Sequence, residues 1–267
     1  IDRTTVIRSV TYRDGKKSNV FAHTYFIQEP ETNLPTVSLS LNSGILFDPE
    51  HGLFMKGTNA IDSLWKLPGA NFWSRKELPV STEIYEADGQ AVYRNQTGFR
   101  LFGGMSRLFP QKSFTLVARK RYGQKRIKHR IFGDEGLKKF KFLVLRNSGS
   151  DFGKSHFRDA LMTSLVEDWD IEKQDYQPAH VYINGDYWGI YNFREKINRY
   201  FLEGHHDNVD KDSLDLIEHR LVRKRGSKKH YQKFWEFLET YSLDNSTNFA
   251  YAQSQMEIDN FMNYQIA

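Results

Sequence analysis

The chain has 267 residues, of which 39% are hydrophobic, 15% aromatic and 27% charged, and its formal net charge is +5. So many aromatic residues argue against a disordered chain, and no apolar run reaches the roughly 20 residues that a membrane-spanning helix needs. Because the chain has no cysteine, disulfides, thiolate nucleophiles, zinc ribbons and iron–sulfur clusters are excluded.

Residues 1–29 predict a β-hairpin. Two strand-like runs, 4–11 and 19–27, flank Asp14-Gly15, and Asp-Gly between such runs is a strong hairpin signal. A two-stranded hairpin is not stable alone, so we expect either the tail of a preceding β-sandwich or an N-terminal hairpin packed on the rest of the chain. The missing initiator Met and the uncapped helical pattern at the C-terminus lead us to expect a piece of a longer protein.

Strand patterns dominate residues 34–147. Each run is bounded by Gly, Asp or Pro, and Asp88-Gly89 predicts a second hairpin turn. The Gly- and Asn-rich segment 56–76 has no periodicity, and we expect it to be a long loop. The expected strands are 35–42, 78–86, 90–103, 112–120 and 139–147.

The pattern becomes helical after Ser150. Apolar residues spaced four apart predict a helix at 155–169, and Asn184-Gly185 joins the two strands of a further hairpin, 179–195. More helices are expected at 196–206, at 228–243 and from 256 onward. This order predicts an α+β protein in which a β-rich N-terminal lobe precedes a helical lobe.

Two basic clusters, 119–130 and 219–233, could attract phosphates, nucleic acid or an acidic partner. They lack the interleaved aromatic residues of a single-strand-binding surface, so nucleic acid is disfavoured as a partner. The acidic turn after His205-His206 lacks the glycine and the terminal glutamate of a calcium loop, and no metal site is predicted there.

Asp151-Phe152-Gly153 spells the metal-binding motif of protein kinases. A catalytic loop upstream would need an Asp after His-Arg and an Asn five residues later, whereas His129-Arg130 is followed by Ile. This literal match is therefore not taken as a kinase active site.

The segment 98–120 is richer in chemistry. Paired glycines allow main-chain N–H groups to approach an anion, and nearby cations supply the opposite charge. The alternative is a twisted hairpin with exposed cations. The residues that would form the phosphate site are Arg100, Gly103, Gly104, Ser106, Arg107 and Lys112.

Four blocks in order resemble the CotH family of spore-coat protein kinases: GFRLFGGMSRLFPQKSFTL, KFLVLRNSGSD, FRDALM and VYINGDYWGIYNFREKI. The resemblance covers residues 34–267, and residues 1–29 are similar to the last hairpin of an Ig-like, chitobiase C-terminal-like β-sandwich. It implies a protein-kinase-like fold that binds ATP and Mg²⁺ and phosphorylates Ser or Thr of proteins. It also implies a secreted bacterial protein in an extracytoplasmic or cell-surface location.

The resemblance implies that the glycine turn covers the nucleotide phosphates and that Lys112 contacts them, with Asp159 or Glu195 as the carboxylate that holds this lysine. The resemblance also implies that four further residues either support the site or contact the phosphates: Arg146, Asn147, Arg158 and Arg194. The complete set of residues expected to bind the cofactor is Arg100, Gly103, Gly104, Ser106, Arg107, Lys112, Arg146, Asp159 and Glu195.

In the family, the catalytic loop and the metal-binding Asp come after the helix equivalent to 256–267. We therefore expect the catalytic residues beyond Ala267 and expect this piece to be inactive alone, because phosphoryl transfer needs those groups. The alternative function is a non-catalytic surface or carbohydrate-associated binding module on a kinase-like scaffold. The protein substrate and the oligomeric state are left open by the sequence.

Overall fold

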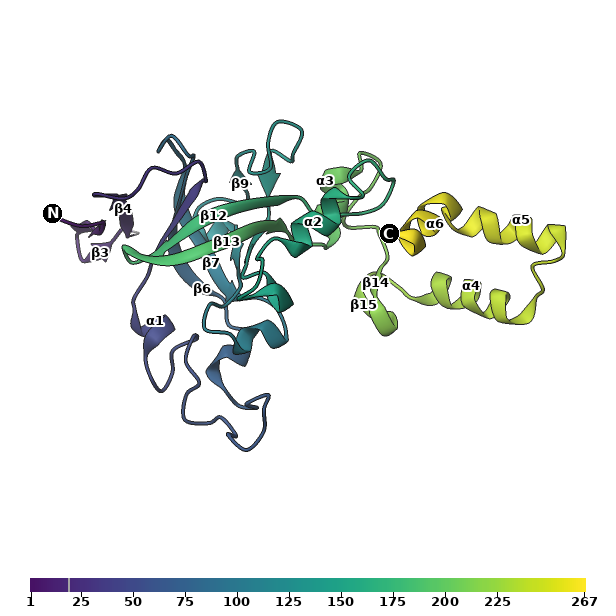
Figure 1. The fold of residues 1–267 in the computed structure, drawn as a ribbon, viewed down its shortest axis with the longest axis horizontal. Coiled ribbons are helices and arrows are strands. Elements are labelled where there is room, and N and C mark those ends of the chain that lie inside the picture. Colours follow the sequence, from purple (N-terminus) through teal and green to yellow (C-terminus); the bar gives the residue numbers. More distant parts are fainter. Residues whose placement is uncertain (19) are drawn as a thin grey trace. The chain divides into compact units, whose positions relative to one another are not determined.

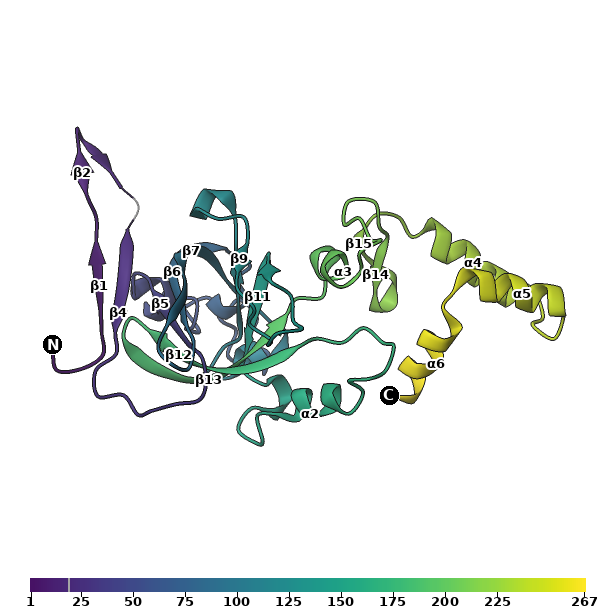
Figure 2. The ribbon, with the colours of Figure 1, turned by 90° about the horizontal axis from the view of Figure 1, so that it is seen from above.

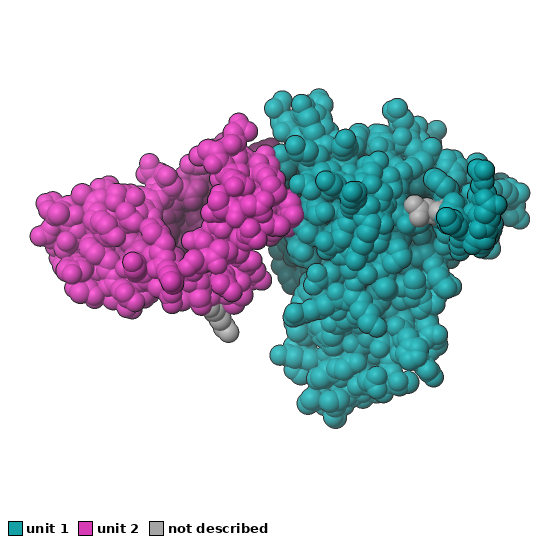
Figure 3. Space-filling view, turned by 180° about the vertical axis from the view of Figure 1, so that it is seen from behind, with its two compact units in different colours: residues 1–159, 175–196 teal, residues 160–174, 197–267 magenta. Residues whose placement is uncertain are grey.

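The computed structural model of the chain describes residues 1–18 and 20–267, without the side chain of Arg220. The chain divides into two compact units, residues 1–159 with 175–196 and residues 160–174 with 197–267 (Figure 3). Asn19, the first residue of the second expected strand, lies outside the described residues. The first unit is rich in strands and the second in helices, so the mixed α and β content expected from the sequence is confirmed.

Seven strands of the first unit form a closed barrel in the order β11-β13-β12-β5-β6-β7-β8, with β8 pairing back to β11 (Figures 1 and 2). All neighbours are antiparallel except β12 and β5, which are parallel. The strands are β5 Thr36–Ser40, β6 Leu78–Tyr85, β7 Ala91–Leu101, β8 Phe114–Val117, β11 Phe142–Arg146, β12 Tyr176–Ile183 and β13 Asp186–Glu195.

The barrel interior is the core of this unit. Successive side chains of a strand point to opposite faces, so Leu143 and Leu145 of β11 are fully buried in the core while Arg146 points outward. Aromatic rings fill the centre, with Phe99 stacked on Phe114 at 4.8 Å between centroids. Closure of the sheet was not expected from the sequence. It removes both free edges, which would otherwise be open to pairing with another chain.

The N-terminal hairpin pairs β1 Thr5–Ser9 with β4 Phe21–Tyr25, and short strands β2 Tyr12–Arg13 and β3 Lys16–Lys17 continue toward its tip (Figure 2). Asp14 and Gly15 have φ values of +48° and +71°, as a type I′ turn requires. The hairpin expected at residues 1–29 is therefore present, while its membership of a β-sandwich stays a prediction.

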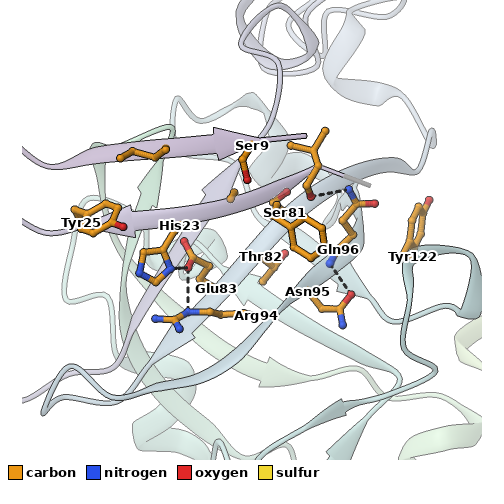
Figure 4. Close-up of a pocket in the computed structure, with 14 residues that line it drawn as sticks. Ser9, His23, Tyr25, Ser81, Thr82, Glu83, Arg94, Asn95, Gln96 and Tyr122 are labelled. Carbon is orange, nitrogen blue, oxygen red and sulfur yellow. Dashed lines mark hydrogen bonds and ion pairs between the residues drawn. The ribbon is translucent and has the colours of Figure 1, made fainter. Parts of the chain in front are cut away.

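This hairpin packs on the outside of β6 and β7. The hydroxyl of Thr24 lies 2.6 Å from Oε2 of the buried Glu83 and 2.7 Å from the Ser38 hydroxyl. Figure 4 shows His23 and Arg94 turned toward the same carboxylate, with nitrogen–oxygen distances of 3.4 and 3.3 Å. A cavity of about 440 Å³ remains between hairpin and barrel. One desolvated carboxylate thus joins the hairpin to the barrel.

The longest connection between barrel strands is the segment that precedes β6. As expected, residues 56–76 contain no strand, and a single 3-10 turn, η1, forms there at Asn71–Trp73. The predicted strand at 139–147 is divided into β10 and β11. The remaining elements are α1 Gly44–Phe47, η2 Met105–Leu108, η3 Lys120–Tyr122, β9 Ile127–Lys128, β10 Lys139–Phe140 and η4 Gly149–Asp151.

Helices make up most of the second unit. Helix α2 begins at Arg158 in the first unit and ends at Ser164, earlier than the predicted 169. Helix α5 was missed by the sequence because its residues form no apolar stripe; Asn245 caps it by accepting hydrogen bonds from two main-chain N–H groups. The other elements are α3 Arg199–His205, β14 Leu216–Glu218, η5 His219–Leu221, β15 Val222–Arg225, α4 Lys229–Thr240, α5 Ser246–Gln255 and α6 Ile258–Ile266.

In the described part of the chain, no helix combines the length and the apolar character needed to cross a membrane.

Candidate functional site

A glycine turn links β7 to β8, and its two glycines differ in their surroundings. Gly103 has a φ of +90°, and a Cβ on it would lie 2.5 Å from the Ser106 hydroxyl oxygen. A Cβ on Gly104 would meet nothing within 4 Å, so this residue faces open space. Within residues 1–18 and 20–267, neither glycine's main-chain N–H donates a hydrogen bond. Two amide donors are therefore available to an approaching anion.

Arg107 secures this turn through main-chain carbonyls. Its guanidinium donates to Gly103 and Leu101 within the turn, at 2.8 and 3.1 Å, and to Phe72 and Ser74 of the preceding loop. Burial, together with the charges of nearby arginines, lowers its pKa. All three nitrogens of the guanidinium thus donate to main-chain carbonyls, and the expected contact of Arg107 with phosphates stays a prediction.

Lys112 is also turned inward. It is 3% exposed, its Nζ donates to the carbonyls of Arg107 and Phe109 at 2.7 and 2.9 Å, and it lies 4.5 Å from the centroid of the Phe72 ring. Burial lowers the pKa of this amine to about 8. The expected carboxylate partner is absent among the described residues, because neither Asp159 nor Glu195 contacts Lys112. Lys112 therefore stabilises the turn from its buried side through these two hydrogen bonds.

Asn147, the residue directly after β11, is the second brace. It is fully buried, accepts a hydrogen bond from the Ser113 hydroxyl at 2.7 Å and donates to the carbonyl of Gln111 at 2.5 Å. A longer bond of 3.4 Å reaches the carbonyl of Ser106. Asn147 therefore links the segment between β7 and β8 to the end of β11.

The outer face of the barrel beside this turn is cationic. Arg100, Thr115, Val144 and Arg194 lie opposite one another in register across β7, β8, β11 and β13. Side chains of directly paired residues project to the same face, and the neighbouring Phe99 fills the core instead. Arg100 makes no ion pair or hydrogen bond with any described residue. This row therefore carries a free cation at one end and a second arginine at the other.

Arg194 is 4% exposed, and its Nε and Nη1 have no hydrogen-bond partner in the described part of the chain. Burial lowers its pKa, the charge of Asp159 opposes that shift, and the charge of Arg146 adds to it. A buried guanidinium with unused donors is costly, and an anion beside it would relieve that cost.

One ion pair connects this face to the next helix of the chain. Arg146, the last residue of β11, places its Nε 2.6 Å from Oδ2 of Asp159 in the first turn of α2. Upstream, Asp151 is 1% exposed and accepts hydrogen bonds from the Ser155 hydroxyl at 2.6 Å and from the main-chain N–H of Arg158 at 3.2 Å. The Asp-Phe-Gly carboxylate thus fixes the start of α2.

Glu195 lies at the end of β13 and is 2% exposed. It accepts a hydrogen bond from the main-chain N–H of Asp175 at 3.2 Å and so ties β13 to the segment that enters β12. The sequence placed Glu195 with the phosphate-binding residues, and this role stays a prediction.

Arg75 was not anticipated by the sequence. Its charge lowers the pKa of Arg107, as that of Arg100 does, so the three arginines lie near one another. It belongs to the aperiodic loop before β6, where no pattern distinguishes a binding residue from a solvated one. It adds an exposed cation beside the glycine turn.

The site suits the phosphates of a nucleotide better than it suits a metal ion. The free amides can donate to phosphate oxygens, and so can Arg75 and Arg100, two cations that have no carboxylate partner among the described residues. No group of three or more His, Asp or Glu side chains that could hold a metal ion occurs among the described residues. His206 contacts Glu172 at 2.5 Å, and the ring of His205 packs against that of Phe201 in a tilted arrangement with 4.4 Å between centroids.

Comparison with known proteins adds one finding. A family model described as CotH kinase protein matches residues 99–267, a span that includes the glycine turn, the Arg146–Asp159 pair and the whole helical unit. No curated protein matches the chain. Because the family model covers more than half of the sequence, the chain belongs to the CotH kinase protein family.

Proposed function

We propose that this chain supplies the nucleotide-binding part of a phosphotransferase that moves the γ-phosphoryl group of ATP to a Ser or Thr hydroxyl of a protein. The observation that carries this proposal is the glycine turn, in which Gly103 and Gly104 are exposed and their main-chain N–H groups donate to no described residue. Family membership supports kinase-like chemistry in general. The choice of ATP, of Mg²⁺ and of a protein hydroxyl is part of the proposal.

The order of the elements supports the same function. In protein kinases, a glycine-rich loop covers the phosphates, and a lysine on the third strand pairs with a glutamate of the next helix. Here the glycine turn joins β7 to β8, β11 lies next to β8, and Arg146 of β11 pairs with Asp159 of α2. We therefore assign to Arg146 the phosphate-contacting role that the sequence suggested for Lys112.

Each residue of the site has a separate task. The amides of Gly103 and Gly104 bind phosphate oxygens, and Lys112 keeps the turn in shape beneath them. Asp159 orients Arg146, so that the guanidinium meets the phosphates without a change of rotamer. Bound Mg²⁺ would neutralise developing charge on the phosphates, and no group of three or more carboxylates or histidines that could hold it occurs among the described residues.

Nucleotide binding by this chain tests the proposal. Isothermal titration should show that ATP and ADP bind more tightly than AMP, because the site recognises phosphates. Arg146→Gln should weaken ATP binding by at least about tenfold, since a charge-assisted hydrogen bond is worth about 1.5–3 kcal/mol. Arg126→Gln, which removes a half-buried arginine of the first basic cluster, is the matched control, because Arg146 is half-buried as well. No affinity for ATP, together with binding of a glycan, would favour the carbohydrate-associated module instead.

A further inference from the structure

A second cavity lies on the barrel surface, outside the residues assigned to phosphate binding. Its volume is about 550 Å³. Three parts of the first unit line it: the segment after β4, the turn from β6 to β7, and the outward side chains of β12 and β13. None of the proposed nucleotide-binding residues belongs to this lining, so the cavity requires its own explanation.

Aromatic rings form one continuous wall of this cavity. Phe26 meets Tyr85 and Tyr182 edge to face, at centroid distances of 5.2 and 5.1 Å. Tyr182 in turn meets Tyr187 at 5.3 Å, and Tyr187 lies 5.6 Å from the ring of His180. Tyr187 is 51% exposed, so its ring is accessible at the mouth of the cavity.

The remaining polar lining is acidic. The carboxylates are those of Glu29, Glu31, Glu86 and Asp88, and neither lysine nor arginine contributes to the lining, although the chain has a net charge of +5. Glu29 is held in place, since it accepts a hydrogen bond from the Tyr182 hydroxyl at 2.7 Å. Glu31 forms no ion pair with any described residue. Glu86 is paired with His129, which lies outside the lining, whereas the other three carboxylates have no cationic partner among the described residues, so the cavity carries net negative charge.

His180 does not compensate the negative charge of the cavity. One ring nitrogen lies 2.9 Å from the Thr32 hydroxyl and the other lies 3.0 Å from the Tyr187 hydroxyl. Burial lowers the pKa of this imidazole, although the charge of Glu29 opposes the shift. It therefore acts as a neutral hydrogen-bonding group that holds Tyr187 in the aromatic wall.

We propose that this cavity binds an alkylammonium group, that is, a protonated or methylated amine. Aromatic faces attract organic cations through their quadrupole, and carboxylates at the rim add charge attraction while the rings exclude water. A neutral ligand of the same shape would gain only the apolar contact, and an anion would be repelled by the four carboxylates. The proposal stands independently of nucleotide binding at the glycine turn.

A pair of isosteric probes tests the role of charge. Choline and neohexanol have the same shape, but only choline is charged, so titration of the whole chain should show choline binding at least about fivefold more tightly. Equal affinities would overturn the proposal, because the cavity would then recognise shape alone. If neither probe binds, a peptide that carries trimethyl-lysine decides the question, and failure of that peptide as well overturns the proposal.

Variants locate the binding. Tyr187→Leu removes an exposed ring and Glu29→Gln removes a carboxylate, and each should weaken choline binding by about fivefold. Tyr12→Leu, at the exposed tip of the hairpin, is the control and should leave the affinity unchanged. Unchanged binding in both cavity variants would contradict the assignment, and circular dichroism establishes that each variant is folded.

Two sources could present such a group, a free amine or a lysine side chain of a polypeptide. Two ligands are therefore titrated separately and compared: choline and a short peptide that carries trimethyl-lysine. Tighter binding of the peptide assigns the cavity to a protein partner, and tighter binding of choline assigns it to a small amine. Either order supports an alkylammonium site, and failure of both ligands refutes it.

Discussion

The structural role of Lys112 can be separated from a role in binding by the pH dependence of protein stability. Its ammonium group is enclosed beneath the glycine turn, where burial lowers its pKa from 10.5 to about 8. Because the folded pKa lies below the unfolded value, the unfolded chain holds this proton more tightly between pH 8 and 10.5. The free energy of unfolding should therefore rise with pH across this window.

The size of this effect is set by the two pKa values. A difference of about 2.5 corresponds to about 3 kcal/mol, because each pKa unit is worth about 1.4 kcal/mol. The amine still donates to the carbonyls of Arg107 and Phe109 after it loses its proton, so those bonds remain while the desolvation cost disappears. The figure is an upper bound, since water that enters the turn would reduce it.

The assay is urea unfolding of the wild type and of Lys112→Met at pH 7 and at pH 10.5. At pH 7 the variant should already be less stable by about 1–3 kcal/mol, because two buried carbonyls lose their donor. The gap between the two proteins should then widen by up to about 3 kcal/mol at the higher pH, since only the wild type gains stability from Lys112. A gap that stays constant with pH would show that this amine is solvated and would refute the reasoning.

Three further outcomes are expected from the described contacts. Gly103→Ala should destabilise the protein by about 1 kcal/mol more than Gly89→Ala in thermal unfolding. Both glycines have a positive φ, but only a Cβ on Gly103 meets another atom within 4 Å. Equal losses of stability in the two variants would contradict this expectation. Although burial opposes it, Arg119 and Arg121 lower the pKa of Glu77 to about 2, so Glu77 stabilises the fold above pH 4.5 and this contribution is lost as the pH falls toward 2. Acid unfolding of Glu77→Gln should therefore lack that dependence, and an unaltered acid transition would exclude the ion pairs. Asp159→Asn should weaken ATP binding about threefold to tenfold. The loss of stability should be small, because the ion pair with Arg146 is about one-third exposed. A large loss of stability with unchanged ATP binding would show that the ion pair has only a structural role.

Local patterns predicted the strands and turns well. Asp14-Gly15, Asp88-Gly89 and Asn184-Gly185 each mark a hairpin, and the glycine of each dipeptide has the positive φ that glycine adopts readily. Alternating apolar residues located the barrel strands to within a few residues. Closure of the barrel could not be predicted, because it depends on the pairing of β8 with β11, and register between distant strands leaves no local pattern.

The site was only partly predictable. Its position at Gly103 and Gly104 reflects the freedom of glycine, and the structure leaves the amides there unpaired. The orientation of the lysine and arginine side chains could not be predicted from the sequence. In a basic segment, the pattern of residues is the same whether a lysine points outward or inward. Lys112 turned inward because the carbonyls of the turn need donors, whereas Arg146 turned outward on its strand toward Asp159.

Nuclear magnetic resonance of the ¹⁵N-labelled chain tests the central claim most directly, because it observes the two amides themselves. Addition of ATP should move the Gly103 and Gly104 amide signals downfield, as expected for N–H groups that begin to donate to phosphate oxygens. The amides of Gly15 and Gly89, which lie in hairpin turns, should remain in place. If ATP binds and leaves the Gly103 and Gly104 signals unmoved, the glycine turn is not the phosphate site.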